Sequence, residues 1–429
     1  MRNKPRIRFK GFTEDWEQRK LGDLIFLNGR IGFRGYTEAD IVSKDEGGVL
    51  TFSPTNIVDN RITIKCKNTY ITRLKYDESP EIKVYNGDIL FVKTGSTLGK
   101  SALVKDIFED ATLNPQVVVM RPNNLASEFL SVMMLTDNIL SQVRKSRIGG
   151  AVPTLTESTI KAFDTLIPKN DEEAQKIGKI FGCLDHVITL HQRKLEKLKL
   201  AKKALLQKLF PKNGSQFPEI RFKGFTDAWE QRKLGEIFEY LQNNTLSRDS
   251  LNYKNPNIKN IHYGDILVKF DEILDGSNKD IPYINPELDL SKFSKSLLRD
   301  GDIIFSDTAE DDTVGKAIEL QNVNAPFILS GLHTIPCRPL IPFSKGYLGN
   351  FLNSNSYRLQ LRPLVQGIKV SSISKSALKD TMIEYPKNLD EQEKIGSLFY
   401  YIAKMITLHQ RKLDRLQEVK IGLLQKMFV

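Results

Sequence analysis

The chain contains one long sequence twice, and this repeat limits what it can fold into. Residues 5–22 (PRIRFKGFTEDWEQRKLG) return at 218–235 (PEIRFKGFTDAWEQRKLG) with 15 identities in 18 positions. Residues 168–181 (PKNDEEAQKIGKIF) match 386–399 (PKNLDEQEKIGSLF), and the octapeptide ITLHQRKL also occurs in both halves. Between these near-constant segments the halves diverge. Solenoid repeats are only ~20–50 residues long, so the pattern predicts a duplicated two-domain protein.

The segment that closes each half predicts a long helix. Asn170 with Glu173, and Asn388 with Glu391, have the spacing of a helix capping box. Apolar residues then recur at intervals of three and four for more than four heptads, which is typical of a coiled-coil seam. The predicted seam consists of Ile177, Phe181, Leu184, Ile188, His191, Leu195, Leu198, Lys202, Leu205 and Leu209 in the first helix, and Ile395, Phe399, Ile402, Ile406, His409, Leu413, Leu416, Lys420, Leu423 and Met427 in the second.

The chain connection favours antiparallel helices. In that arrangement the end of the second helix returns beside the opening segment at 5–22, just as Phe210 runs into the segment at 218–235. The two variable domains would then lie at opposite ends of a helical rod and be related by a pseudo-two-fold axis. A parallel pair would place both domains at one end. Trp16 and Trp229 are predicted to anchor each domain to the helices.

These patterns predict an α+β fold with two mixed, strand-rich domains and two long helices in an antiparallel coiled coil. We expect the first domain at 1–168, its helix at 169–212, the second domain at 213–386 and the last helix at 387–429.

Composition favours an anionic partner and a location inside the cell. The formal net charge is +11, and nucleic acid is the commonest partner of such a protein. No stretch approaches the ~18–20 apolar residues of a membrane span. Three scattered cysteines without CxxC spacing favour reduced thiols and a cytoplasmic location, and argue against a zinc site.

A glycine-rich stretch, TGSTLGKSALV (residues 94–104), raises the question of nucleotide binding. A Walker A loop needs four residues between its first glycine and Gly-Lys-Ser/Thr, whereas Gly95 and Gly99 leave three. The corresponding stretch of the second half, SDTAEDDTVGKA (306–317), is acidic where a phosphate would sit. The stretch is therefore expected to be a turn between strands, or a loop that faces DNA.

Signatures of catalysis are incomplete. SPEIKV (79–84) has an acid-x-Lys pair of nuclease type but lacks a separate metal-binding acid, and LNPQVVV (113–119) lacks the second proline and the aromatic residue of an amino-methyltransferase motif. His191 and His409 fall on the helix seam, where a polar residue that fixes register is favoured over a metal ligand. The sequence therefore predicts no catalytic residue and no metal site.

Candidate DNA-binding residues lie on polar loops of the variable domains, because base edges are read by polar side chains and phosphates by cations. They are Lys93, Thr94, Ser96, Thr97, Lys100, Arg144, Lys145 and Arg147 in the first half, and Ser306, Thr308, Asp312, Lys316, Lys369 and Ser371 in the second.

Taken together, the motifs resemble the specificity (S) subunit of type I DNA restriction-modification enzymes. The similarity covers almost the whole chain. Each half opens with a W-E-x-x-K-L-G segment (WEQRKLGD and WEQRKLGE), contains a "GDI" strand and a Gly-Lys turn, and closes with a helix such as EEAQKIGKIFGCLDHVITLHQRKL. The second helix departs from this pattern at Ala403, where the first has Asp185.

This resemblance implies a non-catalytic protein that binds double-stranded DNA. Each variable domain would be a target recognition domain that reads one half of an asymmetric, bipartite site, and the helices would set the gap between the halves. The chain would join two modification subunits, which bind S-adenosylmethionine and methylate adenine at N6. Restriction subunits would supply ATP- and Mg²⁺-dependent translocation and cleavage.

Two other functions stay open at this stage. A freestanding DNA-binding regulator with a dimer-like duplicated chain would show the same repeat. A single-chain modification enzyme would need the S-adenosylmethionine and nuclease motifs that are missing. Co-purification with an N6-adenine methyltransferase would distinguish a specificity subunit from these two alternatives.

Overall fold

Two long helices have the lengths that the heptad pattern predicts. In the computed structural model, which describes residues 3–150, 152–212, 214–254, 256–288, 291–324, 327–367 and 369–429, α6 spans Asp171–Lys208 and α12 spans Leu389–Met427. All predicted seam residues are buried or part-buried. By contrast, Leu190, Leu200 and Tyr401, which lie off the seam, are exposed.

The chain divides into two units, and each contains part of both long helices. Unit 1 comprises residues 1–192 and 411–429, and unit 2 comprises residues 193–410. Positions 1, 2, 151, 213, 255, 289, 290, 325, 326 and 368, which fall in the predicted domains, lie outside the described residues.

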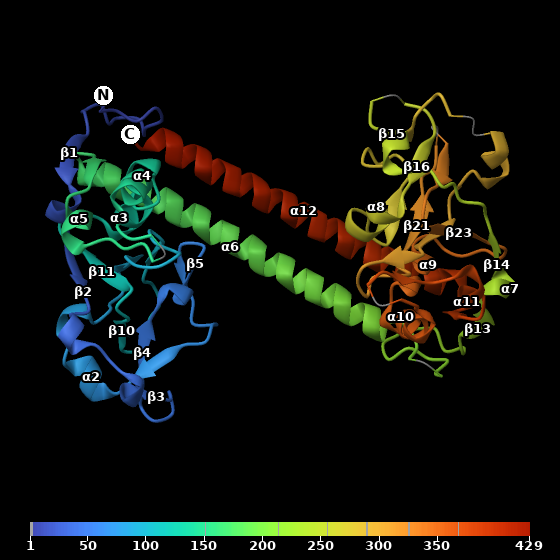
Figure 1. Ribbon diagram of the computed structural model, residues 1–429, viewed down its shortest axis with the longest axis horizontal. Helices are drawn as coiled ribbons and strands as arrows, with labels where there is room; N and C mark the ends of the chain where they lie inside the picture. The colour runs from blue at the N-terminus through green and yellow to red at the C-terminus, as the bar shows by residue number, and fades with distance from the viewer. Residues whose placement is uncertain are drawn as a thin grey trace. The chain divides into compact units, whose positions relative to one another are not determined.

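In its described residues, unit 1 combines three sheets with short helices (Figure 1). Its largest sheet has, in spatial order, β2 (Ile25–Gly29), β11 (Val117–Pro122), β8 (Ile89–Val92), β9 (Ser101–Leu103), β6 (Arg61–Ile62) and β5 (Ile57–Val58). The second has β10 (Ala111–Leu113), β4 (Val49–Phe52), β7 (Thr69–Ile71) and β3 (Ile41–Val42), and the third pairs β1 (Glu17–Lys20) with β12 (Asp164–Ile167). The helices are α1 (Leu21–Leu24), α2 (Arg73–Asp77), α3 (Ser127–Met133), α4 (Asp137–Ser146), α5 (Glu157–Lys161), the first part of α6 and the last part of α12.

Unit 2 repeats this plan with small changes. Its largest sheet has the order β14 (Phe238–Tyr240), β23 (Thr334–Pro339), β19 (Ile303–Ser306), β21 (Ala317–Gln321) and β17 (Ile273–Asp275). The others are β15 (Leu251–Asn252), β18 (Tyr283–Ile284), β16 (Lys259–Ile261) and β22 (Ile328–Ser330); β13 (Glu230–Lys233) with β25 (Met382–Tyr385); and β20 (Thr308–Ala309) with β24 (Ser371–Ser372). Its helices are α7 (Leu234–Ile237), α8 (Tyr263–Val268), α9 (Tyr347–Leu352), α10 (Asn355–Leu361), α11 (Lys375–Lys379), the last part of α6 and the first part of α12.

The two helices run antiparallel inside unit 1. Phe181 near the start of α6 contacts Phe428 just beyond the end of α12, with ring centroids 6.2 Å apart. One turn further along α6, Asp185 accepts a hydrogen bond from Lys420 Nζ at 2.6 Å. Residue numbers therefore rise along one helix and fall along the other, as the chain connection predicts (Figure 1).

The opening segments meet the helix ends in the predicted way. The Ile7 amide donates to the Lys426 carbonyl at 2.9 Å in unit 1, and the Ile220 amide donates to the Lys208 carbonyl at 2.9 Å in unit 2. Trp16 is 1% exposed and packs edge-on against Phe129 and Phe428. The predicted role of the two tryptophans as packing anchors is thus confirmed for Trp16, and Trp229 packs in the same way against Phe210 and Tyr347.

The predicted capping boxes are only half right. Asn170 and Asn388 do cap their helices, because their side-chain oxygens accept from the amides two residues on, each at 2.8 Å. The Glu173 and Glu391 side chains, however, do not accept from the backbone amides of these asparagines as a capping box requires. Arg8 forms a two-pronged ion pair with buried Glu173 at 2.6 and 2.8 Å, and Arg221 forms the same pair with Glu391. A charged guanidinium from the opening segment is a stronger partner than a backbone amide.

Two of the early helix glycines are required by close packing. A Cβ atom at Gly178 would lie 2.7 Å from Glu128 Cβ and 2.8 Å from the Phe129 amide nitrogen, at the start of α3. A Cβ at Gly396 would collide with the Lys345 carbonyl oxygen in unit 2. Gly182 has open space instead. The helix-weakening effect of glycine is therefore offset at two positions where another segment touches the bare helix backbone.

Candidate nucleic-acid interface

The Gly-Lys stretch of unit 1 is a tight turn between strands β8 and β9. Gly95 and Gly99 have positive φ angles of 107° and 90°, which suits glycine. The Gly99 amide donates to the Val92 carbonyl at 2.9 Å, and the Lys100 amide donates to the Thr97 carbonyl at 3.1 Å. Because these amides bond to protein carbonyls, they do not form a phosphate cradle. The prediction of a strand-to-strand turn is confirmed.

A hairpin at residues 148–154 lies against this turn. Ile148 and Thr154 exchange backbone hydrogen bonds at 2.9 and 2.8 Å and close the hairpin. Thr154 also bridges to Thr94, with their hydroxyl oxygens 2.5 Å apart, and the Gly95 amide donates to the Pro153 carbonyl at 2.9 Å. The turn and the hairpin are thus joined at their bases.

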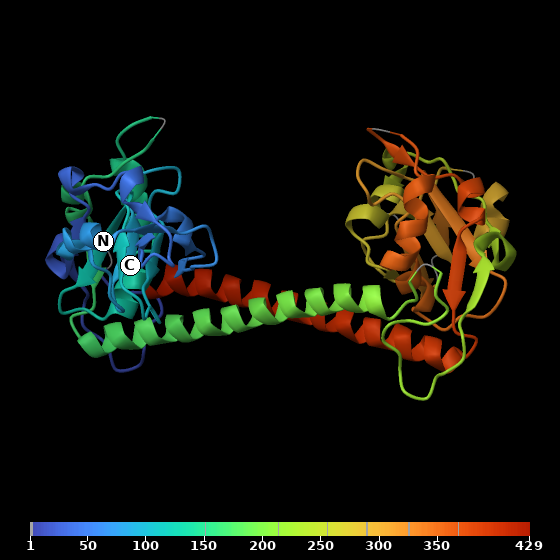
Figure 2. The ribbon, with the colours of Figure 1, turned by 90° about the horizontal axis from the view of Figure 1, so that it is seen from below.

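Unit 2 repeats these bonds. The Gly315 amide donates to the Ser306 carbonyl at 2.8 Å, and the Lys316 amide donates to the Thr313 carbonyl at 2.9 Å. Gln366 and Ser372 close the second hairpin, and β20 pairs with β24 to join it to the turn. We call residues 93–100 with 148–154, and residues 307–316 with 366–372, the turn–hairpin pairs; positions 151 and 368 lie outside the described residues. In Figure 2 each hairpin projects from the body of its own unit.

Most of the DNA-binding residues predicted in unit 1 are accessible. Ser96, Lys100, Arg144, Lys145 and Arg147 are exposed, the last three at the end of α4 and the start of the hairpin. Lys93, Thr94 and Thr97 are part-buried. Lys93 Nζ lies 3.6 Å from Glu157 Oε1, which partly neutralises its charge.

The predicted residues of unit 2 divide into two groups. Asp312 and Lys369 are exposed, and Thr308 and Ser371 are part-buried where β20 pairs with β24. Two other predicted residues point inward, because Ser306 is fully buried and donates to the Thr308 carbonyl at 2.8 Å, while Lys316 Nζ donates to the Phe270 carbonyl at 2.7 Å. Burial lowers the pKa of Lys316. These two side chains hold the turn together from inside.

The turns differ strongly in charge. The turn at 93–100 contains two lysines and no acid, whereas that at 307–316 contains Asp307, Glu310, Asp311 and Asp312 beside the inward-facing Lys316. Asp311 accepts hydrogen bonds from the Thr313 hydroxyl and from the Thr313 amide, the latter at 2.9 Å, and these two bonds lower the pKa of its carboxyl. The prediction named only Asp312 among these acids. The electrostatic field at one pair is therefore positive and at the other largely negative.

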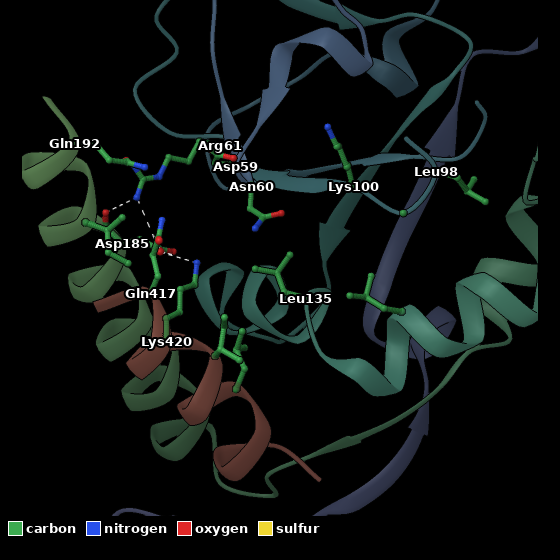
Figure 3. Close-up of a pocket in the computed structure, with 15 residues that line it drawn as sticks. Asp59, Asn60, Arg61, Leu98, Lys100, Leu135, Asp185, Gln192, Gln417 and Lys420 are labelled. Atoms are coloured by element: carbon green, nitrogen blue, oxygen red, sulfur yellow. Dashed lines mark hydrogen bonds and ion pairs between the residues drawn. The ribbon is translucent and has the colours of Figure 1, made fainter. Parts of the chain in front are cut away.

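A cavity of about 570 Å³ lies beside the turn of unit 1 (Figure 3). Asp185 of α6 is central to the wall of this cavity. Its carboxylate accepts a hydrogen bond from Lys420 Nζ of α12, and its backbone carbonyl accepts one from the Arg61 guanidinium of β6. Asp59 and Asn60, which connect β5 to β6, have the positive φ angles of a tight hairpin turn. Sequence reasoning missed Arg61, although its partner Asp185 is one of the positions at which the two long helices differ.

Unit 2 anchors its seam lysine differently. Lys202 of α6 corresponds to Lys420, but its Nζ bonds to Glu272 Oε2 at 2.6 Å, in the segment before β17. Ala403, the residue of α12 that corresponds to Asp185, has no carboxylate that could bind Lys202. Each polar seam lysine therefore ties a helix to a carboxylate, which lies on the neighbouring helix in unit 1 and on the strand-rich domain in unit 2.

The "GDI" aspartates have a structural role. Asp88 accepts from Arg121 Nε at 2.9 Å, and Asp302 accepts from Arg338 Nη2 at 2.6 Å, in each case joining the central strand to its neighbour. Within the described ranges no group of three or more His, Cys, Asp or Glu side chains is placed to hold a metal ion. In the same part of the chain, no helix is both long and apolar enough to cross a membrane.

Two copies of one α+β unit, each with a paired turn and hairpin of different side chains, define a duplicated recognition protein. The sequence matches the family described as "Type I restriction modification DNA specificity domain" twice, over residues 13–200 and 226–418. The chain belongs to this family, and it is a DNA sequence-specificity protein of a type I restriction-modification system.

Individual relatives agree with this assignment. The chain is 24% identical over 424 residues to the type I restriction enzyme MjaVIII specificity subunit of Methanocaldococcus jannaschii, covering 95% of this chain and 90% of that protein. It is also 24% identical to the putative MjaX specificity subunit of the same organism, covering 95% and 91%. The crystal structure of a type I restriction-modification S subunit from M. genitalium has the same fold, with a TM-score of 0.58, 13% identity and 99% coverage of both chains.

Proposed function

We propose that each unit reads one half of an asymmetric, bipartite target in double-stranded DNA through its turn–hairpin pair. The observation that carries this proposal is the contrast between constant backbone bonds and different side chains at the two pairs. Two identical readers would favour a palindrome, whereas readers of opposite charge need different half-sites. Exposed lysine and arginine side chains near the first pair would supply phosphate contacts, and exposed polar groups would read base edges.

The chain itself would perform no catalysis. We assign the reaction to partner subunits: two modification subunits that bind S-adenosylmethionine and methylate adenine at N6, and restriction subunits that use ATP and Mg²⁺. The duplicated helix arrangement supports two equivalent docking places for the modification subunits. The motifs that bind these cofactors are incomplete in the sequence, which agrees with this division of labour.

A domain exchange tests the proposal. Residues 25–163, which include both parts of the first turn–hairpin pair and end before β12, would be replaced by the equivalent segment of a relative and expressed with the modification subunits. Mapping of methylated adenines should show that one half of the target changes and the other stays. A matched exchange in unit 2 should alter only the opposite half. Changes in both halves after a single exchange would refute the modular assignment.

A second measurement addresses catalysis. The purified chain alone should transfer no methyl group from S-adenosylmethionine to target DNA, and addition of the modification subunit should restore transfer. Methylation by the chain alone would overturn the assignment of the reaction to partners. Sequence-specific binding without any association with a modification subunit would favour a freestanding regulator instead.

A further inference from the structure

The tips of the two hairpins expose apolar side chains at equivalent positions. Val152 is 61% exposed in unit 1, and Val370 is 54% exposed in unit 2. Each valine lies three residues after a hairpin glycine, Gly149 or Gly367. Ile148, on the same hairpin as Val152, is 59% exposed as well. A single exposed valine is ordinary, but the same residue at the same place in two otherwise divergent loops points to a shared use.

The hairpin backbone holds each valine outward. Gly149 and Gly367 have positive φ angles of 92° and 105°. A Cβ atom at Gly149 would lie 2.9 Å from the Val152 carbonyl oxygen, and one at Gly367 would collide with the Val370 carbonyl oxygen. Glycine is thus required for the chain to reverse this tightly. The valine that follows each glycine is more than half exposed to solvent.

The base of each hairpin is fixed. Ile148 and Thr154 in unit 1, and Gln366 and Ser372 in unit 2, exchange two backbone hydrogen bonds each, and the Leu155 amide adds a bond to the Lys93 carbonyl at 2.8 Å. Each valine is therefore carried on a short loop with a fixed base. Because the major groove of B-form DNA is wide enough to admit two paired strands, it also admits a loop of this width.

The cations next to the tips favour DNA over a protein or a lipid surface. Exposed Lys145 and Arg147 precede the first tip. In unit 2 exposed Lys369 directly precedes Val370 and places a positive charge at the tip itself, beside the acidic turn at 307–316. One or two apolar side chains bury too little area for a protein interface or for stable membrane binding. Cations beside a small apolar tip suit a groove with phosphates on its walls and apolar methyl groups on its floor.

We propose that the hairpin tips enter the major groove, where Val152 in one half-site and Val370 in the other contact the C5-methyl group of a thymine. This inference rests on the proposed DNA-reading function and deepens it, because it adds an apolar base contact to the polar residues considered so far. Every adenine target pairs with a thymine, so each half-site of an adenine-methylating system contains such a methyl group.

The test uses the complete complex of this chain with its modification subunits. DNA affinity would be measured for the unchanged protein and for Val152→Ser, on target duplexes with thymine or with deoxyuridine in one half-site, since deoxyuridine removes only the methyl group. Val152→Ser should weaken binding to thymine DNA about fourfold, because the single thymine methyl group is then no longer buried against an apolar side chain. It should cause no further loss on DNA that carries deoxyuridine in its half-site. Val370→Ser should show the same pattern in the other half.

Matched controls separate this inference from the proposed function. Lys145→Gln should weaken binding to all sequences alike and reduce the salt dependence, as a phosphate contact does. Because Val152 is exposed, its replacement leaves the fold intact, which circular dichroism would check. An equal loss on thymine and deoxyuridine DNA, or no loss at all, overturns the thymine contact. If the domain exchange still changes one half of the target, the proposed function survives that result.

Discussion

The two turn–hairpin pairs share their backbone bonds and differ in their charge. In both units the turn is closed by the amide of a glycine, Gly99 or Gly315, and the hairpin is closed by a pair of backbone bonds. Apart from the glycines that the tight turns require, these backbone bonds do not depend on side-chain identity. The side chains above this framework run from two lysines in unit 1 to four acids in unit 2. A recognition surface can therefore change its chemistry completely while its geometry stays constant.

The attachment of each unit to the long helices shows the opposite behaviour. Arg8 with Glu173 and Arg221 with Glu391 make nearly identical buried ion pairs. The sequence around them is also nearly identical in the two halves. Variation is thus confined to the segments between the attachments, and small differences at the attachments offer sensitive tests of how alike the two units are.

The largest difference is expected at the buried arginines. Arg8→Ala should cost about 3–5 kcal/mol, because it leaves the Glu173 carboxylate buried without its partner. Arg221→Ala should cost less, because Trp229 Nε1 still donates to Glu391 at 3.3 Å, whereas Trp16 Nε1 has no hydrogen-bond partner among the described residues. Hydrogen exchange at the starts of α6 and α12 would measure both losses. Equal losses would show that the tryptophan does not support the carboxylate.

A pH-dependent difference is expected at β25. Burial raises the pKa of Glu384 to about 7, from an ordinary value of 4.5, while unit 1 has Leu166 at the matching place opposite its β1 strand. A raised carboxyl pKa gives stability that is complete below pH 4.5 and is lost as the pH rises through 7. Glu384→Gln should therefore stabilise unit 2 by about 3 kcal/mol at pH 8 and hardly at all at pH 4.5.

Thermal unfolding of Glu384→Gln and the unchanged protein across this pH range would check the effect. Leu166→Gln in unit 1 provides a control whose stability change should not depend on pH. A constant difference between Glu384→Gln and the parent at all pH values would contradict a titrating carboxyl at this position.

A smaller and local difference is expected at the seam lysines. Asp185→Asn should weaken the link to Lys420 by about 1 kcal/mol, because the carboxylate is partly exposed. Glu272→Gln should cost about 2 kcal/mol, since Lys202 and Glu272 are both largely shielded. Hydrogen exchange should increase around β6 in the first variant and around β17 in the second. Increased exchange in the other unit would contradict the local character of these links.

The smallest effect concerns the two Gly-Lys lysines. Lys100 is exposed, so Lys100→Gln should lower the slope of log affinity against log salt by about one, as loss of one phosphate contact does. Lys316→Gln should leave the slope unchanged, because its ammonium bonds to the Phe270 carbonyl inside unit 2. Titrations of labelled duplex DNA over a series of salt concentrations would decide. Equal slopes for the two variants would contradict the prediction that Lys100 contacts a phosphate and Lys316 does not.

The sequence predicted what is periodic and what is repeated. The heptad pattern located α6 and α12 to within a few residues, and the chain connection predicted their antiparallel packing. What it could not predict are contacts between distant segments, such as Arg61 with Asp185 or Lys316 with the Phe270 carbonyl. A lysine in a polar loop has the same local pattern whether its ammonium points to solvent or to a buried carbonyl. The individual DNA-binding residues stay predictions.

The bare helix backbone at Gly178 and Gly396 has a consequence for how such proteins evolve. A new domain acquired by recombination has to rest on the helix at this spot, where a single added carbon atom would collide with its backbone. Whether a foreign domain fits the resident helix therefore depends on a contact that lies away from the turn–hairpin pairs. An exchanged domain is therefore expected to work with the resident helix only if it leaves room at this contact, whatever target it reads.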